Sequence, residues 1–170
     1  MRINWLNKIP AVILVLLLEF KISSAETLSL FQGEVNADNI NLRSDATVSS
    51  EIICTLNKNE RVDIILELYE WYKIKLPKNA PCYIKKSLVN CITVLSTTEK
   101  QCKNAKVLKN RVNIRLHPNE SSAIIGEVDE NEIVNILKDE GGWYRIDPVQ
   151  NSFGWINKGF INKVAIPHKR

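Results

Sequence analysis

The sequence has only two histidines and contains no C-x-x-C pair. A cysteine nucleophile needs a histidine within hydrogen-bond reach to form its thiolate, but His117 lies in the turn-like stretch LHPNE and His168 lies in the stretch AIPHKR near the C-terminus. A zinc site needs several ligands at characteristic spacings, which two isolated histidines do not supply. We therefore expect a protein that is not an enzyme and that holds no metal and no other cofactor.

The chain also lacks a large excess of charge of one sign. Its formal net charge is +4, from 23 basic and 19 acidic residues. Residues 1–25 hold three of the basic residues and one of the acidic ones, so 20 basic and 18 acidic residues remain in 26–170. These are spread along the chain rather than clustered, and we expect no nucleic-acid partner.

One long apolar run is present, AVILVLLL at 11–18, and no second one follows. Two basic residues precede this run, and the small residues Ser23 and Ala25 follow it, which is the pattern of a signal peptide over 1–25. The run is shorter than the roughly 18–20 residues that span a bilayer, although an uncleaved anchor is the alternative. We expect an exported protein, periplasmic or extracellular, with no stable membrane insertion after cleavage.

A segment of 57 residues occurs twice, at 33–89 and 105–161, with a constant offset of 72 residues. No gap is needed, and 17 of the 57 aligned pairs are identical. The identical pairs include Asn41 with Asn113, Arg43 with Arg115, Ile52-Ile53 with Ile124-Ile125, Trp71-Tyr72 with Trp143-Tyr144, and Ile84 with Ile156. Such self-similarity indicates a duplicated structural unit.

Each copy has the pattern of several short β-strands. INLRS and VNIRL alternate between apolar and polar residues, and the turn-forming stretches SDATVSS and HPNESS follow them. The pattern predicts an all-β protein with two tandem small β-barrels, one over 33–90 and one over 105–163, joined by a linker at 91–104. The CITVL part of that linker could add a strand to the first domain. Because a domain of this size buries little apolar area, packing between the copies or disulfides would help to stabilise it.

The motif order N-h-R, S-x-h-I-G-x-h, G-x-W-Y-x-h and G-W-h, in which h is hydrophobic, resembles the bacterial SH3 (SH3b, or SH3 type 3) domain. The second copy carries it nearly complete as VNIRLHPNESSAIIGEV, GGWYRI and FGWINKGFI. The first copy has INLRSDATVSSEIICTL, EWYKI and CYIKKSLV. The resemblance covers almost all of the chain after residue 25. It implies tandem SH3-like β-barrels of the kind attached to exported proteins, several of which bind peptidoglycan or other surface ligands, but the fold does not fix the ligand.

The first copy departs from this pattern at two glycines. Cys54 stands where the second copy has Gly126, and Cys82 stands where it has Gly154. An even number of cysteines in an exported protein indicates disulfides, and small residues in two strands suggest that their backbones approach closely, as a disulfide requires. Of the three possible pairings we expect Cys54–Cys82 inside the first domain, with the other two cysteines, Cys91–Cys102, closing the connector.

Two arginines recur at equivalent positions, Arg43 and Arg115. Each could hold a ligand carboxylate through a bidentate contact. The alternative is that each ties down a loop through backbone carbonyl groups.

Aromatic residues also recur in the two copies. Because side chains alternate along a strand, Tyr72 and Ile74 are expected to face the core and Trp71 to face solvent. The aromatic candidates for ligand binding are Trp71, Trp143, Tyr83 and Trp155. The alternative for each is that it covers the edge of a small core.

Two functions compete at this point. The first is a non-catalytic binding protein of the cell envelope that recognises peptidoglycan or an envelope protein through tandem SH3b domains. The second is a secreted protein that binds other proteins, for example those of a host, or has a structural role, without affinity for the wall.

Overall fold

The computed structural model describes residues 29–94 and 101–164. The predicted signal peptide at 1–25 lies outside this range. The first copy forms β1 (Phe31–Val35), β2 (Ile40–Arg43), β3 (Ile52–Leu56), β4 (Arg61–Leu68), β5 (Trp71–Lys75), β6 (Cys82–Lys85), the 3-10 turn η1 (Lys86–Leu88) and β7 (Val89–Val94). The second copy forms β8 (Cys102–Val107), β9 (Val112–Arg115), β10 (Ile124–Val128), β11 (Ile133–Glu140), β12 (Trp143–Ile146), β13 (Phe153–Asn157), η2 (Lys158–Phe160) and β14 (Ile161–Val164).

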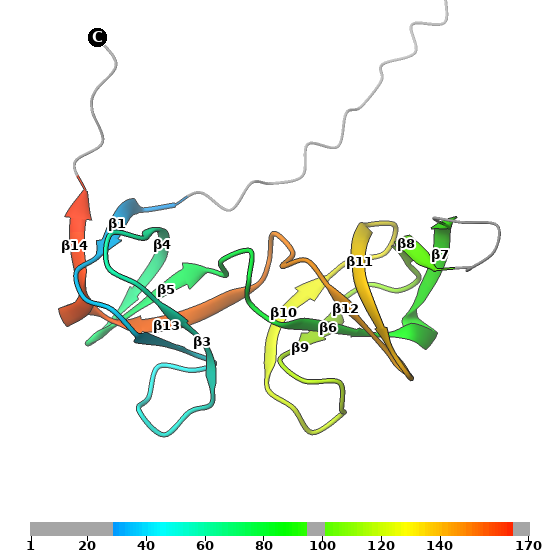
Figure 1. The fold of residues 1–170 in the computed structure, drawn as a ribbon, viewed down its shortest axis with the longest axis horizontal. Helices are drawn as coiled ribbons and strands as arrows, with labels where there is room; N and C mark the ends of the chain where they lie inside the picture. Colours follow the sequence, from blue (N-terminus) through cyan, green and yellow to red (C-terminus); the bar gives the residue numbers. More distant parts are fainter. Residues whose placement is uncertain (1–28, 95–100, 165–170) are drawn as a thin grey trace, which may run out of the picture.

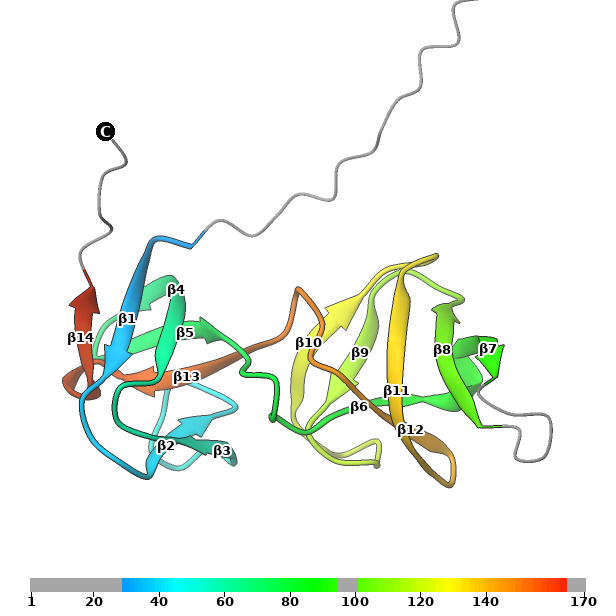
Figure 2. The same ribbon diagram turned by 45° about the horizontal axis from the view of Figure 1, so that its top comes forward.

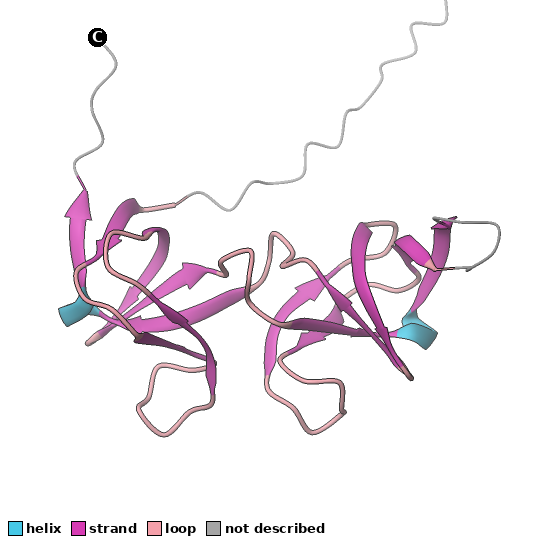
Figure 3. Ribbon diagram, in the orientation of Figure 1, coloured by secondary structure: helices cyan, strands magenta, loops and turns pink. Residues whose placement is uncertain are grey.

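The described residues are strands and loops apart from two short 3-10 turns, which lie near opposite ends of the molecule (Figure 3). The all-β prediction is therefore confirmed. The alternation that predicted it is visible in β5, where Tyr72 and Ile74 are buried and Trp71 is half-buried. Within those two ranges the chain forms no helix long and apolar enough to span a bilayer.

The two copies exchange their last strands. One seven-stranded sheet has the order β14-β1-β4-β5-β13-β2-β3, and the other has the order β10-β9-β6-β12-β11-β8-β7. Figures 1 and 2 show β13, in orange, running from the second lobe into the first, and β6, in green, running the opposite way. We call β1–β5 with β13, η2 and β14 unit 1, and β8–β12 with β6, η1 and β7 unit 2. In the part of the chain that the structure describes, the two outer strands of either sheet do not pair, so each unit is an open SH3-like sheet rather than a closed barrel.

The exchange changes the domain division expected from the sequence. The predicted domains 33–90 and 105–163 follow the two sequence copies, but each spatial unit is completed by strands of the other copy. Ile84 of β6 is fully buried opposite Tyr144 of β12, and Ile156 of β13 is fully buried opposite Tyr72 of β5. Neither copy can therefore complete its core in this arrangement without the other.

Two crossover segments, 76–81 and 147–152, make the exchange possible. The first contains Pro77 and Pro81 and the second contains Pro148. Proline fixes φ and favours an extended residue before it, which disfavours a tight turn back onto the preceding strand. The segments meet where the Leu76 amide donates to the Ser152 carbonyl at 3.1 Å.

A lysine just after each exchanged strand contacts an aromatic ring and a carboxylate of the other copy. Lys86 lies 4.8 Å from the centre of the Tyr144 ring and pairs with Asp139, so the first copy contacts the second. At the equivalent place Lys158 lies 5.3 Å from the centre of the Tyr72 ring and pairs with Glu67. The same contacts are thus made twice, in opposite directions between the copies.

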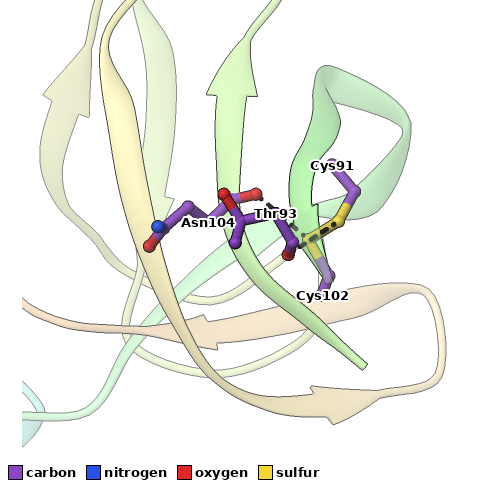
Figure 4. The surroundings of a disulfide bond; sticks show 4 residues. All are labelled: Cys91, Thr93, Cys102 and Asn104. Carbon is purple, nitrogen blue, oxygen red and sulfur yellow. Dashed lines mark hydrogen bonds between the residues drawn. A yellow bond between two sulfur atoms is a disulfide. The ribbon is translucent and has the colours of Figure 1, made fainter. Parts of the chain in front are cut away.

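The segment expected to be a linker is a β-hairpin in its described part. β7 and β8 pair antiparallel, and the Cys91–Cys102 disulfide joins them across a Cα–Cα distance of 5.7 Å (Figure 4). This disulfide agrees with the expected pairing. The apolar CITVL stretch does add a strand, but the sheet that it extends belongs to unit 2.

The expectation of a Cys54–Cys82 disulfide was wrong: both cysteines are free thiols. Cys54 lies in β3 of unit 1, whereas exchange carries Cys82 into unit 2, where it is fully buried. The close approach to β2 and β3 is made instead by Gly154, where an added Cβ would lie 2.7 Å from Leu42 Cγ and 3.1 Å from Ile53 Cδ1. The inference of close packing was right, but the neighbouring strand comes from the other copy.

Candidate functional site

Two grooves occupy equivalent places, one on each unit. The first has a volume of about 230 Å³ and the second about 270 Å³. The first groove is lined by Asn39, Ile40, Asn41, Arg43, Val48, Trp71, Asn157 and Phe160. The second groove is lined by Lys85, Ser87, Leu88, Lys109, Asn110, Arg111, Val112, Asn113, Arg115, Glu120 and Trp143. Every lining residue of the first groove has its repeat equivalent in the second.

The exchanged segments complete both grooves. Asn157 and Phe160, from β13 and η2 of the second copy, line the groove of unit 1. Lys85 and Leu88, from β6 and η1 of the first copy, line the groove of unit 2. No sequence pattern joins these residues with the tryptophans, since that step requires knowing that the last strands cross over.

The structure places the four paired candidates in these grooves. Arg43 and Trp71 lie together in the first groove, and Arg115 and Trp143 lie together in the second. Each tryptophan is half-buried, so one part of the ring is held by the sheet and another part lines the groove. A fixed indole with an accessible face can stack on a sugar ring or on an apolar side chain.

The two arginines tie down loops. Arg43 donates from Nη1 to the Ser50 carbonyl at 2.7 Å, and Arg115 donates from Nη1 to the Ser122 carbonyl at 2.7 Å. The loop-tying alternative therefore describes one role of both residues. A guanidinium has five N–H donors, so this role does not consume its capacity to contact a ligand.

The other two aromatic candidates lie elsewhere. Trp155 lines a third cleft, of about 540 Å³, between the units, next to Phe153. Lys73 Nζ lies 4.5 Å from the centre of the Phe153 ring and 5.8 Å from that of Trp155. Tyr83 is 9% exposed and lies in β6 opposite Arg145, a position that suits packing better than ligand contact.

The free thiols are unsuited to nucleophilic chemistry in the described structure. Burial, together with the nearby Glu60 carboxylate, raises the pKa of the Cys54 thiol to about 11. Burial, with a smaller effect of Cys54, raises the pKa of the Cys82 thiol to about 12. Because the reactive form is the thiolate, both groups are almost entirely unreactive thiols at neutral pH. Among residues 29–94 and 101–164, no group of three or more His, Cys, Asp or Glu side chains could hold a metal ion.

Comparison with known families agrees with the repeat. The bacterial SH3 domain matches twice, at residues 38–90 and 110–162. The chain belongs to the bacterial SH3 domain family. The matched segments follow the sequence copies, so each bacterial SH3 match contributes strands to both spatial units.

The sequence is also similar to that of a bacterial protein. Over 143 residues, or 84% of this chain, the sequence is 21% identical to a protein of Bacillus subtilis (strain 168) named putative N-acetylmuramoyl-L-alanine amidase YrvJ. The aligned part is 27% of that protein's length, so the chain spans about a quarter of this relative.

Proposed function

We propose that the protein is an exported, non-catalytic binding protein of the cell envelope that recognises peptidoglycan or an envelope protein through its two grooves. The observation that carries the proposal is the duplication of one groove, with a tryptophan and an arginine at equivalent places in each unit. Binding two neighbouring sites on one polymer raises the overall affinity without any new contact. Peptidoglycan, with its repeating sugars and peptides, is a polymer of this kind.

The envelope assignment draws support from the family and from the related protein. Bacterial SH3 domains are binding modules, and the relative is named a putative N-acetylmuramoyl-L-alanine amidase. The apolar segment near the N-terminus supports export. The raised pKa values of the two free thiols support a non-catalytic role.

Retention of the full chain on purified peptidoglycan sacculi tests the proposal. We expect retention at low salt, weaker retention for Trp71→Ala and for Trp143→Ala, and little retention for the double variant. Ile133→Ala is the matched control, since Ile133 is an exposed apolar residue outside both grooves. Failure of the unaltered protein to sediment with sacculi would contradict recognition of peptidoglycan.

One observation favours the alternative, a protein partner without wall affinity. The β4–β5 hairpin of unit 1 exposes Leu66, Leu68 and Tyr69, whereas the equivalent residues of unit 2 are Lys138, Glu140 and Gly141. Exposed apolar patches mark sites of contact with other proteins, among other partners. Crosslinking in the native compartment, with the triple exchange of these three residues for their unit 2 equivalents, would separate this function from wall binding.

A further inference from the structure

The two grooves differ in charge although they share a backbone design. Arg43 is the one charged residue in the lining of the first groove. The lining of the second groove has four cationic residues and one acidic residue, Glu120, a balance of +3. The net difference comes from Arg111 and Lys109, which stand where the first copy has Asn39 and Ala37. Glu120 and Lys85, which replace Val48 and Asn157, cancel each other in net charge but place an ion pair in the second groove.

Glu120 lies between two of these cations. Its Oε1 accepts a hydrogen bond from Lys85 Nζ at 2.5 Å, and its Oε2 lies 3.7 Å from Arg115 Nη2. Lys85 comes from the exchanged strand β6 and Arg115 from β9, so the exchange itself brings the two cations together. The hydrogen bond from Lys85, aided by the charges of Lys85 and Arg115, lowers the pKa of Glu120, so the two cations favour its ionised form.

We propose that the second groove is a binding site for a carboxylate-bearing peptide, and that Glu120 occupies the carboxylate position until the ligand displaces it. The inference rests on the proposed function and assigns a ligand class to one of its two grooves. The Glu120 side chain is 63% exposed and that of Lys85 is 44% exposed, and exposed ion pairs contribute little to stability. Releasing this pair therefore costs little.

The cationic residues left by that release suit a ligand carboxylate. The Arg115 side chain is 14% exposed and is fixed by its bond to Ser122, so its guanidinium is already oriented. Lys109 and Arg111 line the same groove and add positive charge around the entering group. Trp143 lies in the same lining and offers an apolar surface for the part of the peptide next to the carboxylate. The first groove has an apolar residue at the Glu120 position and an amide at the Lys85 position, so Arg43 is its one cation for a ligand carboxylate.

Calorimetric titration of the full chain with a short stem peptide tests this assignment. The probe is a peptide ending in D-alanine with a free carboxylate, compared with the same peptide as its C-terminal amide. We expect the free acid to bind more tightly, by about tenfold, because a charged hydrogen bond is lost in the amide. Glu120→Gln should tighten binding of the acid by about 2–5-fold, the usual strength of an exposed ion pair. Lys85→Met should weaken it by about tenfold.

A matched change in the first groove serves as the control. Val48→Ala lies at the position equivalent to Glu120 and should leave the affinity for the acid unchanged. Equal affinity for acid and amide, or no tightening in Glu120→Gln with an unchanged circular dichroism spectrum, would overturn the inference. No binding of the acid by either the unaltered chain or Glu120→Gln at millimolar concentration would overturn it as well.

Failure of this inference is distinguishable from failure of the proposed function. Retention on sacculi that depends on the tryptophans but not on Glu120 or Lys85 would leave wall binding intact and remove the carboxylate site. Carboxylate-dependent peptide binding without retention on sacculi would support the site and contradict peptidoglycan as its source.

Discussion

Ile156 offers a direct test of the strand exchange. It belongs to the second copy by sequence but is fully buried in unit 1, opposite Tyr72. Replacing a buried isoleucine by alanine costs about 2–5 kcal/mol, because apolar contacts are lost and a cavity remains. If the cost is near 3 kcal/mol, amide hydrogens that exchange only when that unit opens should exchange about 100-fold faster, since each 1.4 kcal/mol is tenfold.

Hydrogen exchange read by mass spectrometry of peptic fragments measures this effect. In Ile156→Ala we expect faster exchange in β2 and β5 of the first copy, with β9 and β12 of the second copy little changed. Ile84→Ala is the reciprocal control, because Ile84 is fully buried in unit 2, and it should accelerate exchange in β9 and β12. Faster exchange that follows the sequence copy in either variant, rather than the spatial unit, would refute the exchanged arrangement.

Three further predictions concern thiols and packing. Because burial raises the pKa of Cys54 to about 11 from 9.0, this thiol should alkylate about 100-fold more slowly at pH 8 than an ordinary thiol. Its alkylation rate should rise tenfold per pH unit towards pH 11. A plateau of the rate near pH 9 would contradict the effect of burial. Replacing Cys91 and Cys102 by serine should lower the free energy of unfolding in urea by about 3 kcal/mol, since the bond closes a short loop of sequence separation 11, and an unchanged midpoint would show that the hairpin needs no crosslink. Gly154→Ala should lower the free energy of unfolding by about 1–3 kcal/mol through overpacking. Gly142→Ala is the control and should change that free energy by no more than about 0.5 kcal/mol, because an added Cβ there meets nothing within 4 Å. Equal melting temperatures of the two variants would argue against the tight contact at Gly154.

The sequence located the groove residues only in part. Trp71 and Trp143, with Arg43 and Arg115, were found because identical residues recur at an offset of 72. Lys85, Glu120, Asn157 and Phe160 were missed, since nothing local relates them to the tryptophans. These residues do differ between the copies at equivalent positions. That difference can be interpreted only when the residues lining the groove are known.

Local patterns determined the strands, the all-β class and the family. Alternation fixes which side chains of a strand face the core, so residues such as Tyr72 and Ile74 could be assigned from their neighbours alone. The Cys91–Cys102 disulfide agreed with expectation because both cysteines lie in one hairpin. All of these features depend on short stretches of chain.

Tertiary structure alone decided which copy completes which unit. Ile84 and Ile156 are equivalent residues, and each finds the same kind of neighbours whether its strand turns back or crosses over, because both cores are built from the same pattern. The pattern of buried residues is thus compatible with either connection. The choice lies in the two crossover segments and in packing across the units, and it decides that Cys82 leaves Cys54 unpaired and that Lys85 meets Glu120 and Arg115.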